Sequence, residues 1–143
     1  MGKRTGKRKA YHHGDLPRVL LAKAAELLNE RGVSGFSLRE VARRAKVAAA
    51  APSHHFGNVA GLLTAIANDG FRELIADAER VLSQDLKPEA GVICVCEAYV
   101  KCHSRNPGVF SIMFRNDLLN SEDSELNDVR PRSLELLKES SIS

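Results

Sequence analysis

The sequence predicts an all-α protein. Its 143 residues are rich in Ala and Leu, 43% of them are hydrophobic and only 5% are aromatic, a composition typical of helical cores. Apolar residues recur every three or four positions over several stretches, which is the spacing of one helix face. Segments containing Gly, Pro or Asn separate these stretches. No stretch approaches the roughly eighteen apolar residues that a membrane-spanning helix needs, so we expect a cytoplasmic protein with no membrane partner.

A basic segment opens the chain at residues 1–14, where five Lys and Arg residues occur without any Asp or Glu. Because Gly2 and Gly6 add flexibility, we expect a flexible, disordered arm. It is either a solubilising tail or an arm that orders against the DNA backbone or minor groove. A DNA-binding pattern follows directly, and this favours the second interpretation.

The first helix is expected to begin at Asp15, whose carboxylate can cap it, with Pro17 in the first turn, where a missing N–H is tolerated. Gly32 can end this helix in the left-handed conformation. Its apolar stripe predicts a scaffold that packs behind the following elements, and comprises Leu16, Leu20, Ala24, Leu27 and Leu28.

Residues 37–56 are the stretch around which the chain is organised. Ser37 and Glu40 are spaced as in a capping box, where each side chain satisfies a backbone N–H of the other residue. The helix they start has an apolar face of Leu38, Val41, Ala42 and Ala45 and a solvent face of Arg39, Arg43 and Arg44. It stops at Lys46, and a second helix is expected over Ala49–His55. Two short helices joined by about three or four residues form a helix-turn-helix, whose second helix enters the DNA major groove.

Several motifs in this region resemble the N-terminal DNA-binding domain of the TetR/AcrR family of bacterial repressors. They comprise Tyr11-His12-His13-Gly14-Asp15, the helix end from Ala24 to Gly32, Ser37-Leu38-Arg39-Glu40-Val41-Ala42, Ser53-His54-His55-Phe56-Gly57 and Leu62-Leu63. The resemblance is close over the first half of the chain. It implies a three-helix DNA-binding domain over residues 15–60, with the helix-turn-helix at 37–56, and a helical ligand-binding and dimerisation domain over residues 61–143. It also implies that His55 and Phe56 pack in the domain core.

The predicted recognition helix offers small side chains rather than the Arg, Lys, Asn or Gln that usually read base edges. We therefore expect apolar contacts with thymine methyl groups, hydrogen bonds from Ser53 and His54, and a larger share of phosphate and shape recognition. The candidate DNA-binding residues are Lys7, Arg8 and Lys9 in the arm, Ser37 and Arg39 in the first helix of the pair, Ala48, Ala49, Ala50, Pro52, Ser53 and His54 around the second, and Asn58 after it.

Three positions depart from the family pattern. Ala48 stands where a Ser or Thr cap is usual, which costs the helix start about 1 kcal/mol. Ser53 stands where many members have a phosphate-binding Tyr, and Val59 where many have a Lys with that role. The basic arm is a candidate to compensate for both missing contacts.

The rest of the chain predicts further helices. Asn58 can cap a long helix that ends near Lys87-Pro88, and its apolar stripe comprises Leu62, Leu63, Ile66, Ala67, Leu74, Ile75, Ala78 and Leu82. A helix over about Glu89–Ser104 carries Val92, Ile93, Cys96, Tyr99, Val100 and His103. A short apolar helix at residues 109–114 follows, then a polar loop, and a last helix from Ser124 that is kinked or restarted at Pro131.

The resemblance extends to the short apolar helix, which matches the family's Pro-x-x-Phe-x-x-Met-Phe segment and implies a ligand pocket among the later helices. The candidate ligand-binding residues are Tyr99, His103, Phe110, Met113 and Phe114, although aromatic and Met side chains at helical spacing are more often plain core. Family members usually continue with two further long helices that form the dimer, so the second domain looks incomplete at its C-terminus.

Metal and cofactor sites are not expected. The pairs His12-His13 and His54-His55 lack further ligands at suitable spacing. Cys94, Cys96 and Cys102 are expected to be free thiols in a cytosolic protein. Cys96 and His103 align on one helix face, so a metal or redox sensor is an alternative to the commoner buried, apolar role of cysteine.

Charge divides the chain. Residues 1–58 carry 12 Lys and Arg against 4 Asp and Glu, a net charge of +8, and residues 59–143 carry 9 against 14, a net charge of −5. The basic half contains the predicted helix-turn-helix, as expected if it binds phosphates. The sequence and the resemblance together predict a transcriptional repressor that binds a palindromic operator as a homodimer and is released by a small-molecule effector. The alternative is a helical nucleic-acid-binding or interaction module without operator specificity, and the absence of a nucleophile-base pair or phosphate loop disfavours an enzyme.

Overall fold

The computed structural model describes the backbone of residues 2–142 and the side chains of residues 15–140. Within these residues every regular element is a helix, which confirms the predicted fold class. The elements are α1 (Gly2–Arg31), a short 3-10 turn η1 (Val33–Gly35), α2 (Leu38–Ala45), α3 (Ala51–Phe56), α4 (Val59–Leu82), α5 (Pro88–Arg105), α6 (Pro107–Met113) and α7 (Ser124–Ile142).

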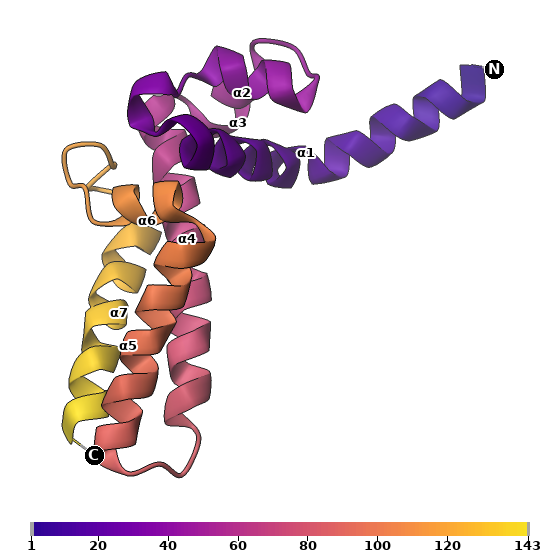
Figure 1. The fold of residues 1–143 in the computed structure, drawn as a ribbon. Coiled ribbons are helices and arrows are strands. Elements are labelled where there is room, and N and C mark those ends of the chain that lie inside the picture. Colours follow the sequence, from indigo (N-terminus) through magenta and orange to yellow (C-terminus); the bar gives the residue numbers. More distant parts are fainter. Residues whose placement is uncertain (1, 143) are drawn as a thin grey trace.

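The helices form two parts, which we call the head (residues 15–58) and the rear (residues 59–140). In the head, α1, α2 and α3 pack together at one end of the molecule, while α4, α5 and α7 run side by side away from it (Figure 1). The short helix α6 lies at the junction and contacts α1, α4 and α5. Among the described residues, no helix is both long and apolar enough to cross a membrane.

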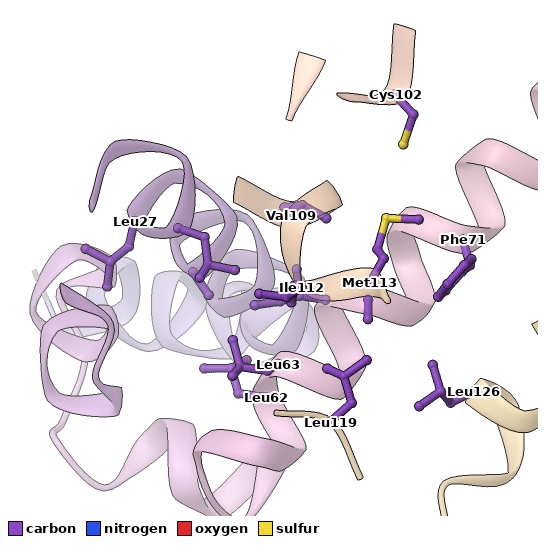
Figure 2. Packing of buried hydrophobic residues seen from close by; sticks show 14 of the residues in the cluster. Leu27, Leu62, Leu63, Phe71, Cys102, Val109, Ile112, Met113, Leu119 and Leu126 are labelled. Carbon is purple, nitrogen blue, oxygen red and sulfur yellow. The ribbon is translucent and has the colours of Figure 1, made fainter. Parts of the chain in front are cut away.

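One hydrophobic core joins the head to the rear. Leu27 from α1, Leu63 and Phe71 from α4 and Ile112 from α6 belong to the same buried cluster (Figure 2). Leu20 of α1 is a member of this cluster too. A second, smaller cluster of Ala78, Val95 and Leu136 holds the far ends of α4, α5 and α7 together. The predicted stripe of α4 is therefore confirmed as core, and it packs in one cluster with residues of α1 and α6.

The predicted start of the first helix at Asp15 is wrong, whereas the flexibility of the basic arm stays a prediction. Helix α1 begins at Gly2, contains Pro17 in its interior, and its N-terminal part projects away from the rest of the molecule (Figure 1). Lys, Arg and Ala are good helix formers, and they allow the helix to continue through residues 2–14. Pro17 removes one N–H donor and its ring crowds the preceding turn, which weakens the helix locally, yet α1 continues through it.

Two other predicted boundaries also change. Helix α3 begins at Ala51 rather than Ala49, because the backbone N–H of Ala51 bonds to the carbonyl of Ala48 (3.0 Å) and no side chain caps an earlier start. Residues 46–50 therefore form a longer turn than expected. Helix α7 passes through Pro131 as one helix and does not restart there.

Helix α5 buries a different face from the one that its larger apolar residues suggest. Gly91, Val95, Ala98 and Cys102 are buried, whereas Ile93 and Val100 are 59% and 64% exposed. The buried face is composed mainly of small residues, which allow α5 to lie close to α4 and α7. A narrow apolar stripe, with Cys96 between Ile93 and Val100, is left facing outward.

Candidate nucleic-acid interface

Helix α2 begins as predicted at Ser37. This residue has an extended backbone, and its hydroxyl oxygen accepts a hydrogen bond from the backbone N–H of Glu40 (3.1 Å). The reciprocal half of the capping box is not formed, because the Glu40 carboxylate instead accepts a hydrogen bond from Nε of Arg43 (3.0 Å) and lies 3.5 Å from Arg31. The hydrogen bond from Arg43 lowers the pKa of Glu40, although partial desolvation opposes this shift.

Arg44 was predicted on the solvent face of α2, and this prediction is wrong. Its side chain is 17% exposed, and its guanidinium pairs with Glu30 of α1 at 2.5 Å. This hydrogen bond lowers the pKa of Glu30. Arg44 therefore joins α2 to α1 through this ion pair and is not an unpaired cation on the solvent face.

The turn between α2 and α3 depends on Lys46, a non-glycine residue with a positive φ (59°). Its N–H bonds to the carbonyl of Arg43 (3.2 Å), and the N–H of Val47 bonds to the carbonyl of Ala42 (3.1 Å). These bonds satisfy carbonyls at the end of α2, and Val47 packs against the core. The Lys46 side chain is exposed beside the turn.

The outer surface of the turn and α3 is made of small and polar side chains. Ala48, Ala49, Ala50, Ser53 and His54 are exposed there, as predicted. The Ser53 hydroxyl donates to the carbonyl of Ala50 (3.0 Å), so only its lone pairs are free to accept a hydrogen bond. No residue with a long hydrogen-bonding side chain faces outward from α3 itself.

The predicted burial is wrong for both Pro52 and His55. Pro52, expected on the DNA-facing surface, is buried in the first turn of α3, where its apolar ring is removed from water. His55, expected in the core, is exposed, while Phe56 packs against the core as predicted. The ring of His55 contacts those of His54 and Phe56, with centroid distances of 5.3 Å and 6.3 Å.

Asn58 acts as the cap of α4. Its Oδ1 accepts a hydrogen bond from the N–H of Gly61 (2.8 Å), and its backbone is extended. The predicted cap is confirmed, and the Nδ2 group of Asn58 remains available to donate a hydrogen bond.

Two cations of the helix-turn-helix have no acidic partner within residues 15–140. Arg39 on α2 and Lys46 at the turn are both exposed, whereas Arg43 and Arg44 are held by Glu40 and Glu30. Sequence reasoning missed Lys46 as a candidate, although a basic residue in the turn of a helix-turn-helix is a usable signal. Lys7, Arg8 and Lys9 belong to the N-terminal part of α1, and their side chains lie outside the described residues.

The predicted ligand-binding residues occupy three different environments. His103, Phe110 and Phe114 form a series of edge-to-face contacts that ends on the buried Phe71, with successive centroid distances of 5.3, 5.5 and 5.3 Å. Met113 is fully buried beside Phe71 in the core (Figure 2).

Tyr99 makes a structural contact between α5 and α7. Its hydroxyl donates to the carbonyl of Ser133 (2.7 Å), and burial raises its pKa. A cleft of about 550 Å³ lies elsewhere, between α1 and α4, lined by residues such as Arg18, Asp69 and Asn106. The predicted pocket set is thus not brought together as one lining.

The cysteines are free thiols, as predicted for Cys94, Cys96 and Cys102. Burial raises the pKa of Cys102, and this lowers the fraction of its side chain that is thiolate at neutral pH. No group of three or more potential metal ligands occurs among the described side chains.

Comparison with known proteins adds to this geometry. The family model for bacterial regulatory proteins of the tetR family matches residues 20–66, which include α2, α3 and the start of α4. A solved structure of a protein with unknown function from Rhodococcus sp. RHA1 is 36% identical, with a TM-score of 0.76, and the match covers 91% of this chain and 68% of that one. A TetR family transcriptional regulator, PfmR from Thermus thermophilus, is 26% identical, with a TM-score of 0.70, over 85% of this chain and 67% of that one.

The chain belongs to the TetR family. It is a DNA-binding transcription regulator with a helix-turn-helix, and proteins of this family are regulators rather than enzymes. Comparison with curated protein sequences gives no match.

Proposed function

We propose that this TetR-family protein is a repressor that binds a palindromic operator as a dimer and leaves it when a small molecule binds the rear. The observation that carries the proposal is the outer surface of the helix-turn-helix, where Ala48, Ala49, Ala50, Ser53 and His54 are exposed together. A surface of small side chains allows the backbone to approach base edges closely. The unpaired cations Arg39 and Lys46 flank it and supply attraction to phosphates.

Each group has a distinct role in this proposal. The Ala methyl groups contact thymine methyls, and His54 and the lone pairs of Ser53 make the base-edge or water-mediated hydrogen bonds. The sugar-phosphate backbone of the DNA is contacted by Ser37, Arg39, Lys46 and the Asn58 amide. The basic N-terminal part of α1 adds further phosphate contacts.

A dimer would place the two recognition helices about 34 Å apart, one turn of DNA, and so raise affinity for paired half-sites. The apolar stripe of Ile93, Cys96 and Val100 on α5 is one exposed surface that a second copy could cover. Sedimentation of the full chain at several concentrations tests this step. A monomer at every concentration would contradict the dimeric part of the proposal.

The effector site is proposed at the aromatic series of His103, Phe110 and Phe114. His103 is exposed and Phe114 is 40% exposed, so a flat apolar or aromatic molecule can reach these rings from solvent. An effector acts only through unequal affinity for the DNA-bound and released arrangements. Release of bound duplex by library compounds, and loss of that release in Phe110→Ala, would support this site.

A second candidate function is supported by the same recognition helix. Because no Arg, Lys, Asn or Gln reaches outward from α3, base discrimination by direct contacts is expected to be modest. The protein would then bind duplexes by shape and charge, as an architectural module.

Selection of bound duplexes from a random pool separates the two candidates. A repressor should enrich an inverted repeat whose half-sites are about ten base pairs apart, and it should bind that repeat at least about a thousandfold more tightly than random duplex. Comparable affinity for both duplexes would favour the architectural module. Failure to bind any duplex at low salt would contradict both.

A further inference from the structure

Asn29 joins the head to the first turn of α6 with both ends of its side-chain amide. Its Nδ2 donates to Oδ1 of Asn106 (3.0 Å), and its Oδ1 accepts from the backbone N–H of Gly108 (2.8 Å). Asn106 is the residue that precedes α6, yet its own side chain makes no capping bond to that helix. An N–H at the start of α6 is thus capped by a residue of α1, 79 positions away.

The backbones of α1 and α6 touch at the same point. A Cβ atom on Gly108 would lie 2.3 Å from the carbonyl oxygen of Leu28 and 2.7 Å from the backbone nitrogen of Asn29. Only glycine permits this approach, so α6 packs against α1 as closely as the two backbones allow. We call Asn29, Asn106 and Gly108 the α1–α6 clamp.

Helix α6 is held equally closely on its other side. A Cβ on Gly70 of α4 would lie 2.8 Å from Sδ of Met113 and 3.1 Å from Cγ1 of Val109, so α6 fits tightly between α1 and α4. The same seven-residue helix carries Phe110, whose ring contacts His103 and Phe114. Phe110 therefore lies on a helix whose first turn is bonded to the head.

We propose that Asn29 is a positioning residue that couples the aromatic surface of α6 directly to the orientation of α1, in addition to any coupling through α4. This inference rests on the proposed function, since it names how the effector site acts on the DNA-binding surface. The side-chain bonds of the α1–α6 clamp are intact in one arrangement of α6. They are lost when α6 moves, and the Leu20 and Leu27 contacts of α1 then relax with them.

Amide hydrogen exchange of the full chain tests the clamp without DNA or effector. Asn29→Ala should accelerate exchange at the Gly108 amide by about tenfold, the effect of losing one cap. Asn29→Asp keeps the acceptor for Gly108 and should accelerate it less. Asn127→Ala is the control, because it also removes an Asn side-chain hydrogen bond, here a local one from Nδ2 to the carbonyl of Ser121 six positions away, and that bond does not involve α1 or α6. Faster exchange confined to Gly108 and residues 24–31 supports the clamp, whereas an unchanged Gly108 amide contradicts it.

A double-mutant cycle tests the coupling itself. Phe110→Ala should alter exchange at residues 24–31 in the natural sequence and have little further effect in Asn29→Ala, a non-additivity of about threefold or more. Asn29→Asp, which retains one bond, should restore part of the Phe110 effect; a residue with a merely structural role would not do this. Additive effects in the cycle would overturn the proposal.

The same cycle measured by duplex affinity distinguishes this inference from the proposed function. If the natural sequence binds a selected duplex and the two substitutions are additive in affinity, the clamp fails while the DNA-binding role stands. If no duplex binds, the proposed function fails, and the exchange cycle still decides whether α6 and α1 are coupled.

Discussion

The helix-turn-helix and the α6 junction are held by contacts of very different range. In the helix-turn-helix, Ser37 bonds to Glu40 three positions away, and Lys46 bonds to Arg43. At the α6 junction, Asn29 reaches residues 77 and 79 positions along the chain. The first region is therefore built by local rules of capping and turn geometry, and the second exists only when the whole core has assembled.

The most direct test of this difference is Gly108→Ala. The added Cβ clashes with backbone atoms of α1 that cannot rotate away, so the free energy of unfolding should fall by about 2–3 kcal/mol, despite the better helix propensity of Ala. Gly91→Ala is the control, since its Cβ would meet only Ser140 at 3.8 Å, and it should be neutral or slightly stabilising. Urea denaturation measures both. Equal effects would show that the α6 junction is not tightly constrained.

A substitution in the helix-turn-helix should instead affect binding and leave folding almost unchanged. Arg39→Ala removes an unpaired cation, so the slope of log affinity against log salt should decrease in magnitude by about one. Arg43→Ala should change this slope less, because Glu40 already neutralises Arg43. Fluorescence anisotropy with a labelled duplex at several salt concentrations measures the slopes. Identical slopes for the two variants would contradict the assignment of Arg39.

The local rules themselves can be tested at Ser37. Ser37→Ala leaves the N–H of Glu40 without its partner and should destabilise the protein by about 1 kcal/mol. Ser53→Ala removes an exposed hydroxyl that bonds only within its own turn, and should change stability by less than about 0.5 kcal/mol. Thermal unfolding compares the two serines, and a larger effect at Ser53 would invert the expected order.

The smallest expected effect is a pH dependence of the contact between α1 and α2. The hydrogen bond from Arg44 lowers the pKa of Glu30 from 4.5. The ionised form of Glu30 is therefore more stable in the folded protein than in the unfolded chain. The stabilisation is present above pH 4.5 and is lost as the pH falls through the lower folded-state value. Glu30→Gln should flatten the acid limb of a plot of melting temperature against pH. An unchanged acid limb would show that solvent screens this exposed pair fully.

Much of the helix-turn-helix could be predicted because its determinants are adjacent in sequence. The caps at Ser37 and Asn58, the stop at Lys46 and the exposure of Ala49, Ser53 and His54 all follow from spacing and residue type. The errors occur where a distant partner decides. Arg44 was expected in solvent because its spacing places it opposite the apolar face, but Glu30 draws it onto α1. Pro52, predicted on the DNA-facing surface, is instead buried in the first turn of α3.

The rear was less predictable for the same reason. Periodicity correctly assigned the stripe of α4, which is apolar over many turns, but it could not tell which face of α5 would be buried. Both sides of α5 carry apolar residues, and the choice of the side with Gly91 and Ala98 depends on how closely α4 and α7 approach.

By itself, the sequence determined the helical class, the order of the helices, the helix-turn-helix and the concentration of positive charge beside it. These depend on interactions between residues a few positions apart and on composition. The tertiary structure alone decided which cations are neutralised, which face of α5 is buried, and that Asn29 caps α6. Those outcomes arise because residues compete for partners that become neighbours only when the core forms. The spacing of residues along the chain does not predict which partner is chosen.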